Sequence, residues 1–309
     1  MKKIAVIGSG VMGSNIALSF AINGYSVTLN DVKEEFLVKA KSRIEENLSL
    51  LVEENDVCEG KKKAALENIT CAIDLKKAVI EADFIVEAIP EVIELKWALY
   101  SKLSEMIRPE TIVASNTSTY PLSRLTEKSS FPEQMVITHF FNPAHLVPLV
   151  EIVQHARTKS EVIDETMELI RDIGKSPILL KREVTGFIAN RLQTALMREA
   201  FYLVKEGVAS ARDIDTAITA GPGFRWAFTG PIEIADFGGL DTWQRVFDNI
   251  APELDNSKEA PALIREFAEG GKLGVKTGEG IYSYTGEAVS QKLNQQSRDF
   301  IQLRKIKRL

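Results

Sequence analysis

At the start of the chain, the pattern of apolar and polar residues is typical of a strand, then of a helix, and then of a strand and a helix again. Ile4–Ile7 is a short β-branched run that ends at glycines, and Ile16–Ala21 has helical apolar content that stops at Asn23-Gly24. Tyr25–Asn30 alternates apolar and polar residues as a second strand, and a long charged helix follows from about Lys33 to Glu54. This order predicts a βαβ unit at the N-terminus.

The same alternation continues to about residue 180. Strands and helices in turn are typical of a parallel sheet. The further strands expected are Phe84–Ala88, Ile112–Ala114, Met135–Phe140, Leu149–Val153 and Pro177–Leu180, with helices over Leu95–Ile107 and Ser160–Ile173, the latter closed by Gly174. We therefore predict an α/β fold with a doubly wound, mainly parallel sheet over residues 1–184.

The strand pattern ends after Val184. The next segment, Gly186–Glu206, has apolar residues on more than one helical face, which is typical of a helix that is buried from several sides. Further helices follow, among them Ala211–Ala220. Because 309 residues exceed the usual size of one domain, we predict a second, all-α domain over residues 185–309.

Composition narrows the class of protein. A hydrophobic share of 45% and a charged share of 26% are those of an ordinary globular chain. The net charge is -5 with both signs interleaved, so a nucleic-acid partner is not expected, and we interpret Lys61–Lys63 as a solvated helix start. Two cysteines and three histidines in the whole chain argue against a metal site. The apolar run near Met1 is too short for a signal peptide or a membrane span, so we expect a cytoplasmic protein with no membrane partner.

The sequence Gly8-Ser9-Gly10-Val11-Met12-Gly13 fits G-x-G-x-x-G and lies between a predicted strand and a predicted helix. Gly8 permits the tight turn, Gly10 lets the backbone approach a pyrophosphate, and Gly13 allows close packing of helix on strand. Amide groups at the helix start face the anion. We therefore predict a Rossmann-type dinucleotide-binding domain, with Gly8, Gly10, Val11, Met12 and Gly13 at the cofactor.

Asp31 indicates which dinucleotide binds. It closes the second predicted strand 18 residues beyond Gly13, where a carboxylate accepts hydrogen bonds from the adenosine ribose and repels a 2′-phosphate. This favours NAD over NADP, although Lys33 nearby keeps NADP open. Alternatively, Asp31 caps the following helix.

Polar residues follow two later strands, at Ser115–Ser118 and at His139–Pro143. The carboxyl ends of parallel strands line the crevice where open α/β sheets bind ligands. Hydride transfer from an alcohol needs a base for the hydroxyl proton, and imidazole titrates in the right range. Glu151 is placed to hold the other ring nitrogen of His139, but spacing alone does not distinguish this pair from a core histidine and a surface strand residue.

Six motifs together resemble the L-3-hydroxyacyl-CoA dehydrogenases, in order and over essentially the whole chain. They are Gly8–Gly13, Glu87–Glu91, Ser115–Ser118, His139–Pro143, Gly186–Arg191 and Gly274–Tyr282. The resemblance implies NAD-dependent interconversion of a 3-hydroxy and a 3-keto group on an acyl-CoA such as 3-hydroxybutyryl-CoA, in fatty acid metabolism. It also implies a homodimer through the C-terminal domain, which agrees with the apolar helices there.

The resemblance also implies roles for individual residues. His139 matches the catalytic base and Glu151 the carboxylate that orients it, while Ser118 and Asn190 match residues that hydrogen-bond the reacting oxygen. The positions that match cofactor contacts around the nicotinamide half are Glu91, Lys96 and Asn142. A buried amide at Asn190, near the start of a largely apolar helix, would also be costly without a partner.

Two segments depart from the CoA-using relatives. The end of the long second helix reads Glu53-Glu54 where those relatives carry lysines toward the CoA phosphates, and carboxylates there would repel a phosphate. The segment Gly221–Pro231 is similar instead to the branch of L-gulonate 3-dehydrogenase, lambda-crystallin and carnitine dehydrogenase, whose small substrates are CoA-free. Within it, Arg225 is suited to pair with a substrate carboxylate, or else forms a structural salt bridge or packs on Trp226.

Three functions therefore stay open, in this order. Acyl-CoA dehydrogenation comes first because most motifs follow that family, and the same chemistry on a small CoA-free hydroxy acid comes second. The third is a non-catalytic, crystallin-like protein that retains NAD, since a fold alone does not establish activity. Against this third function stands the joint presence of His139, Glu151, Ser118 and Asn190.

Overall fold

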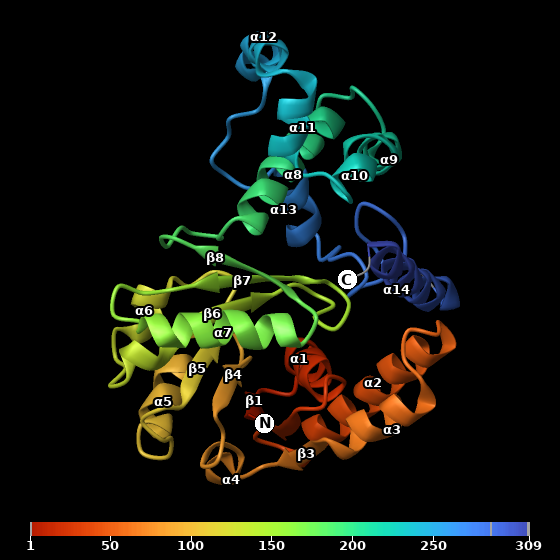
Figure 1. Ribbon diagram of the computed structural model, residues 1–309. Coiled ribbons are helices and arrows are strands. Elements are labelled where there is room, and N and C mark those ends of the chain that lie inside the picture. Colours follow the sequence, from red (N-terminus) through yellow and green to blue (C-terminus); the bar gives the residue numbers. More distant parts are fainter. Residues whose placement is uncertain (1, 285, 308–309) are drawn as a thin grey trace. The chain divides into compact units, whose positions relative to one another are not determined.

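The computed structural model describes residues 2–284 and 286–307 (Figure 1). The chain forms two compact units. The first comprises the residues up to Ile188 together with those from Gln296 onward, and the second comprises Ala189–Gln295.

A single eight-stranded sheet forms the centre of the first unit, in the order β3-β2-β1-β4-β5-β6-β7-β8. Neighbouring strands are parallel except β6 and β7, which are antiparallel. The strands are β1 Lys3–Ile7, β2 Ser26–Asn30, β3 Ile69–Ala72, β4 Phe84–Glu87, β5 Ile112–Ser115, β6 Met135–Phe140, β7 Leu149–Val153 and β8 Ser176–Leu180. The predicted α/β fold with a doubly wound, mainly parallel sheet is confirmed.

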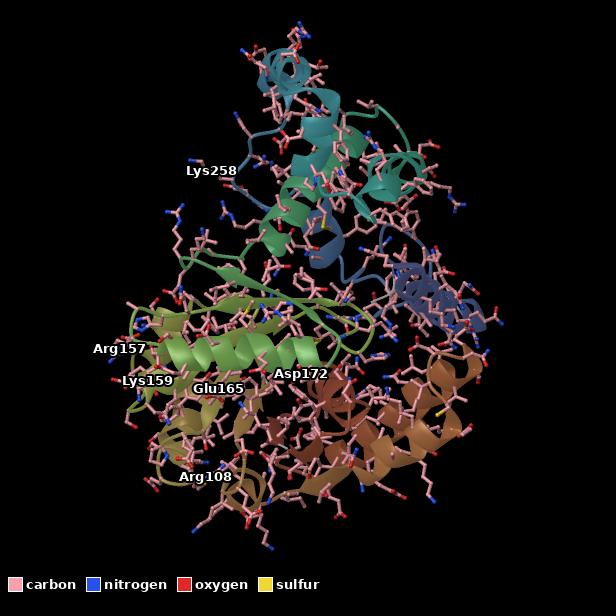
Figure 2. All side chains as sticks on the ribbon, viewed as in Figure 1. Arg108, Arg157, Lys159, Glu165, Asp172 and Lys258 are labelled. Atoms are coloured by element: carbon pink, nitrogen blue, oxygen red, sulfur yellow. The ribbon has the colours of Figure 1, made fainter. Side chains whose placement is uncertain are left out.

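Helices cover both faces of this sheet. They are α1 Val11–Ala21, α2 Glu34–Glu53, α3 Glu59–Glu67, α4 Leu75–Val79, α5 Ile93–Leu103, α6 Leu122–Thr126, the 3₁₀ turn η1 Pro132–Gln134 and α7 Ser160–Asp172. The second half of α14 Glu287–Lys307 also belongs to the first unit and packs near the end of α2. Alternation along β1 shows how the sequence makes two cores, because Ile4 and Val6 join one apolar cluster and Ala5 and Ile7 the other. On α7, the charged Glu165 and Asp172 lie on the exposed side (Figure 2).

The second unit is helical, as predicted. Its helices are α8 Ala189–Lys205, α9 Ala211–Ala220, α10 Pro222–Trp226, α11 Pro231–Gly238, α12 Leu240–Ile250, the 3₁₀ turn η2 Ala251–Glu253, α13 Ala262–Glu269 and the first part of α14. The expectation that the first of these helices is buried from several sides is wrong for the single chain. No residue of α8 is fully buried, because the described residues cover its apolar faces only in part: Leu192 is 60% exposed, while Phe201 and Val204 are half-buried.

The two compact units divide after Ile188, a few residues beyond the predicted domain boundary after residue 184, which stays a prediction. The helix expected from Gly186 begins only at Ala189, because Gly186 and Phe187 both have positive φ, at 75° and 51°, which a helix does not allow. Phe187 instead packs in the core of the first unit. At the other end, Ile301 is fully buried in a cluster with Leu51 and Leu146, so the C-terminal segment belongs to the first unit.

Within the described ranges, no helix combines the length and the apolar content needed to cross a membrane.

Candidate active site

The glycine loop lies between β1 and α1, at the carboxyl edge of the sheet. Gly8 has φ of 97°, and a Cβ on it would lie 2.5 Å from the carbonyl oxygen of Ala88. A Cβ on Gly13 would lie 1.7 Å from the carbonyl oxygen of Gly8, so only glycine lets α1 approach β1 this closely. On Gly10, the N-cap of α1, a Cβ would meet no protein atom within 4 Å. Packing does not require glycine there, which fits a role in the close approach of a bound pyrophosphate.

Asp31 follows β2 and lies beside this loop. Its Oδ2 accepts hydrogen bonds from the backbone N–H and the hydroxyl of Ser9, both at 2.7 Å, and its Oδ1 accepts from the amide of Val32. The N-cap of α2 is Lys33, without a side-chain cap, so Asp31 does not cap the helix as the alternative interpretation held. The carboxylate is thus fixed next to the pyrophosphate loop, where the fold places the adenosine ribose.

His139 and Glu151 face each other across the only antiparallel strand pair among the named strands, β6 and β7. The Nδ1 atom of His139 lies 2.8 Å from Oε2 of Glu151. Glu151 is fully buried and His139 is 4% exposed, so little water competes for this contact. A carboxylate at Nδ1 favours the tautomer with the proton on Nδ1, which leaves Nε2 as the basic nitrogen.

The turn before α8 completes this pair. The backbone N–H of Ile188 donates to the other carboxylate oxygen of Glu151 at 2.9 Å. The ring of Phe187 lies 5.3 Å from the ring of His139, and that of Phe141 lies 4.6 Å from it. The positive φ angles of this turn therefore direct the Phe187 ring and the Ile188 amide toward the His139–Glu151 pair. The sequence pattern revealed neither group, because it predicts a helix over this segment.

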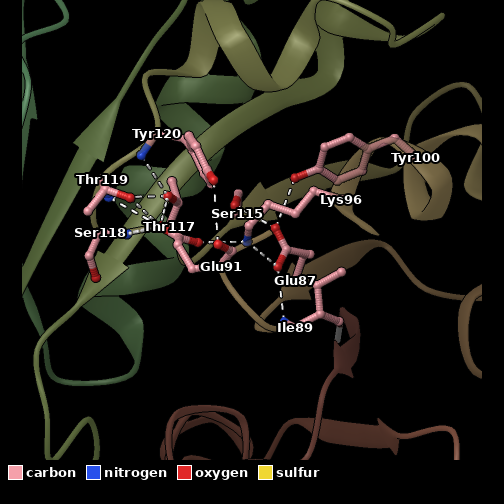
Figure 3. Close-up of polar contacts among 10 residues, drawn as sticks. All are labelled: Glu87, Ile89, Glu91, Lys96, Tyr100, Ser115, Thr117, Ser118, Thr119 and Tyr120. Atoms are coloured by element: carbon pink, nitrogen blue, oxygen red, sulfur yellow. Dashed lines mark hydrogen bonds and ion pairs between the residues drawn. The ribbon is translucent and has the colours of Figure 1, made fainter. Parts of the chain in front are cut away.

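A second buried carboxylate, Glu87 at the end of β4, organises the neighbouring strands (Figure 3). Its oxygens accept hydrogen bonds from Lys96 at 2.7 Å, from Tyr100 at 2.9 Å, from Ser115 at 2.6 Å and from the amide of Ile89 at 3.0 Å. Burial and the Glu87 charge raise the pKa of Tyr100 well above its usual value, so this phenol stays a donor. In the sequence, the only sign of this hub of hydrogen bonds is the position of Glu87 at the end of an otherwise apolar strand.

Lys96 connects this hub to Glu91. Its Nζ lies 3.1 Å from Oε2 of Glu91, and its side chain is 1% exposed. Burial by itself raises the pKa of Glu91, but hydrogen bonds from Thr117 and Thr119 and the charge of Lys96 lower it. Lys96 thus bridges the carboxylates of Glu87 and Glu91, and its expected contact with the cofactor stays a prediction.

Glu91 in turn holds the loop that carries Ser118. One carboxylate oxygen accepts from the amides of Ser118 and Thr119, at 3.1 and 3.2 Å, and from the hydroxyl of Thr119 at 2.9 Å (Figure 3). The Ser118 side chain is exposed after β5, next to the strand of His139. The amide oxygen of Asn116 ties the two strands together by accepting from the Phe140 N–H at 2.9 Å.

The remaining predicted residues lie in two places. Asn142 is exposed in the loop after β6. Asn190 and Arg225 belong to the second unit, so their proximity to His139 stays a prediction. Arg225 is the one charged residue among the described residues that line a cavity of about 480 Å³. It makes no ion pair within the described residues, so the proposed structural salt bridge is not observed; the aromatic residues of that cavity are Phe224, Phe228, Phe237 and Trp243.

The acidic end of α2 is paired within the first unit. Arg298 of α14 binds both Glu53, at 2.6 Å, and Glu54, and Gln302 donates to Glu54 at 2.7 Å. The hydrogen bonds from Arg298 and Gln302 lower the pKa of Glu54. The sequence pattern gave no sign that the C-terminal helix returns to this place.

No group of three or more His, Cys, Asp or Glu side chains that could hold a metal ion occurs in the part of the chain that the structure describes. The carboxyl edge instead presents a glycine loop, the carboxylate of Asp31 beside it and a histidine–glutamate pair. These features, with the matches given next, define the class of protein: an NAD-dependent oxidoreductase with a Rossmann-type cofactor domain.

The chain belongs to the 3-hydroxyacyl-CoA dehydrogenase family. Residues 3–184 match the 3-hydroxyacyl-CoA dehydrogenase, NAD binding domain, and residues 186–284 match the 3-hydroxyacyl-CoA dehydrogenase, C-terminal domain. The resemblance, the cofactor and the enzyme class expected from the sequence are thereby confirmed.

Similar proteins act on different substrates. A 5-formyl-3-hydroxy-2-methylpyridine 4-carboxylate 5-dehydrogenase of Mesorhizobium japonicum is 32% identical over 99% of this chain and 98% of its own. A solved structure of an enzyme of this name, described as an NAD⁺-dependent dismutase, has a TM-score of 0.93 and the same coverage. A probable 3-hydroxybutyryl-CoA dehydrogenase of Deinococcus radiodurans is 35% identical over 91% of this chain and 100% of its own. An L-carnitine dehydrogenase of Streptomyces griseus is 37% identical over 86% of this chain and 79% of its own.

Proposed function

We propose that the protein interconverts a secondary alcohol and a ketone, with His139 as the base that removes the hydroxyl proton. The contact that supports this proposal is that between Nδ1 of His139 and the buried Oε2 of Glu151, at 2.8 Å. A carboxylate held by the Ile188 amide cannot turn away, so it fixes the ring and stabilises the imidazolium that forms. In the reverse direction the same imidazolium returns the proton to the ketone oxygen.

NAD, when bound, supplies the hydride acceptor or donor for this reaction. Gly8, Gly10 and Gly13 would admit its pyrophosphate, and Asp31 would face its adenosine ribose. Ser118 and Asn190 would hydrogen-bond the reacting oxygen. Glu91, Lys96 and Asn142 would act around the nicotinamide, the first two by holding the Ser118 loop in place.

As the substrate class we propose a small hydroxy acid without CoA, which reverses the order that the sequence favoured. The end of α2 carries Glu53 and Glu54, and both are bound to Arg298 of the C-terminal helix. The resemblance implies that CoA-using relatives direct lysines from this position toward the CoA phosphates. The C-terminal helix lies beyond residue 284, where the match to the family's C-terminal domain ends. The pyridine carboxylate dehydrogenase, in contrast, aligns over 99% of this chain.

An acyl-CoA thioester is the second candidate. Both domains match the 3-hydroxyacyl-CoA dehydrogenase family, and the Deinococcus relative is named for 3-hydroxybutyryl-CoA. A role in fatty acid metabolism and a cytoplasmic location stay predictions that go with this candidate.

The test is NADH oxidation with acetoacetyl-CoA, run beside NAD reduction with 3-hydroxybutyrate, L-gulonate, L-carnitine and a hydroxymethyl-substituted pyridine carboxylate, whose alcohol carbon carries the hydrogen to be transferred. Turnover of a free acid alone would support the proposal, and loss of that turnover in Arg225→Met, but not in Arg245→Met, would assign the carboxylate contact. Turnover of acetoacetyl-CoA alone would establish the second candidate. Tight NADH binding with no turnover of any compound would favour the non-catalytic alternative.

A further inference from the structure

A polar cavity of about 240 Å³ lies in the first unit, away from the glycine loop and the His139–Glu151 pair. The ends of α1 and α2, the start of α3, the loop that precedes β7, the loop between α7 and β8, and α14 surround it. Its lining includes Asn23, Asp56, Lys61, His145, Lys175 and Arg304.

Lys175 is the central charge of this cavity. The residue is 8% exposed, and its ammonium donates to the carbonyl oxygens of Ala144 at 2.6 Å and Val147 at 3.0 Å. An ammonium has three N–H donors, so two carbonyls leave one donor for another acceptor. Lys175 makes no ion pair within the described residues. Burial, and then the Arg304 charge, lower its pKa to about 7, as expected for an ammonium without a counter-ion.

His145 contributes a second group without a partner. It is 91% buried, and its Nδ1 has no hydrogen-bond partner in the structure. Burial lowers the pKa of His145 to about 3, and the charges of Lys175 and Arg304 add to this effect. The ring is therefore neutral at physiological pH, and its Nδ1 can carry the proton and donate it. A buried polar atom without a partner is costly, which favours a ligand that would use it.

The charges around the cavity are unbalanced. Arg304 is engaged, since it binds Asp56 and donates to the carbonyl oxygen of His145 at 3.2 Å. Asp56 is the one carboxylate of the lining, and it faces three cationic side chains, Lys61, Lys175 and Arg304. With Asp56 and Arg304 paired to each other, Lys175 and Lys61 remain without a counter-charge from the cavity wall.

We propose that this cavity binds a small oxyanion, such as free phosphate or the phosphate group of a small metabolite. The anion would accept from Lys175, His145 and Lys61, and it would supply the negative charge that the wall lacks. Because Lys175 also holds the carbonyls of Ala144 and Val147, the occupied cavity would stiffen the loop that follows Asn142 and Pro143. The concentration of phosphate would then control the stiffness of a loop next to the reaction centre.

The experiment is calorimetric titration of the full-length protein with inorganic phosphate, after saturation with NADH so that the pyrophosphate site is filled. We expect saturable binding to one site per chain. Lys175→Met should weaken it about tenfold or more, as expected for loss of a charged hydrogen bond. The matched control Lys102→Met, which removes an exposed lysine from α5, should bind as the wild type does. Affinity for sulfate, an oxyanion whose charge does not change over this range, should fall from pH 6 to pH 8, about one unit on either side of the Lys175 pKa, because Lys175 loses its proton.

Two further arms keep the result decisive. If Lys175→Met does not fold, Lys61→Met at the cavity rim should still weaken phosphate binding about threefold. Glycerol 3-phosphate that binds where free phosphate does not would assign the anion to a metabolite and still support the site. Absence of saturable binding by both anions, or binding equal in wild type and in folded Lys175→Met, would overturn the proposal. These readouts do not depend on turnover.

Discussion

At the residue scale, the two buried carboxylates of the first unit, Glu87 and Glu151, each bind partners from other elements. Spacing alone left His139 and Glu151 with two interpretations, because Glu151 lies twelve positions after His139 and the loop between their strands has no periodic pattern. The strand register favours the paired interpretation, because it places His139 directly opposite Glu151. Glu87 and Arg298 were missed for the same reason, since their partners depend on tertiary packing.

Replacing His139 by Gln should lower kcat by roughly 10²–10⁴, the usual contribution of a general base, while NADH binding stays unchanged. The measurement is steady-state turnover of the best substrate from the panel, with NADH affinity from fluorescence titration. The matched control is His155→Gln, whose Nδ1 only accepts from the nearby Arg157 amide. Full turnover in His139→Gln would remove this residue from the mechanism.

His145 should make the protein sensitive to acid. Its pKa is about 3 when folded against 6.5 ordinarily, so between these values the unfolded chain binds the extra proton and folding stability falls as the pH drops. The difference of about 3.5 units corresponds to at most ~5 kcal/mol. We expect His145→Leu to lose less stability than the wild type between pH 7 and pH 4, measured by urea unfolding at both values. Parallel losses in the two proteins would contradict this.

At the element scale, strong periodic patterns were enough for the sheet centre. The strands Met135–Phe140 and Leu149–Val153 were predicted with the bounds that the structure shows. The short edge strand Ile69–Ala72 was not predicted, and of the helix Glu59–Glu67 only a start at Lys61–Lys63 was, because a half-exposed edge strand and a mostly polar helix have weak periodicity. The break before α8 depends on positive φ at Phe187, which no residue pattern predicts for a phenylalanine.

The glycine loop allows packing and binding to be separated with one pair of variants. Gly13→Ala puts a Cβ 1.7 Å from the Gly8 carbonyl oxygen, so α1 must move, and we expect a loss of roughly 1–3 kcal/mol or more together with loss of NAD binding. Gly10→Ala meets no protein atom, so stability should change by about 1 kcal/mol at most while NAD affinity falls about tenfold or more.

Chemical denaturation and NAD titration of the two variants check this. Equal stability of the two variants would show that Gly13 is not needed for packing. Undiminished NAD affinity in Gly10→Ala would show that the pyrophosphate does not approach the backbone there.

At the scale of the whole molecule, the chain leaves the first unit at Ile188 and returns to it at Gln296. The sequence predicted two domains, but it did not predict that the chain returns to the first unit. The segment Glu287–Lys307 has the pattern of a polar helix, and such a pattern does not show which element the helix packs against. Three of its side chains, Arg298, Gln302 and Arg304, bind acidic residues at the end of α2. The proposal of a CoA-free substrate depends on this return of the chain, because it brings Arg298 to Glu53 and Glu54.

The second unit exposes apolar side chains that its own fold does not cover. Along α12, Leu240, Trp243, Phe247 and Ile250 recur every three or four residues and so share one face. Three of them, Leu240, Phe247 and Ile250, are 64%, 61% and 51% exposed. Apolar patches of this kind mark interfaces, and a two-fold dimer is the commonest way for a single chain to cover one.

We therefore expect light scattering to give about twice the chain mass of 34.3 kDa at micromolar concentration. Phe247→Glu should shift the population toward the monomer, because a charge in an apolar interface loses its water without gaining a partner. Val38→Glu is the matched control, since Val38 is equally 61% exposed but lies on α2 of the first unit. A wild-type protein that scatters as a monomer would exclude the dimer, whereas a dimer weakened equally by both variants would place the interface elsewhere than on α12.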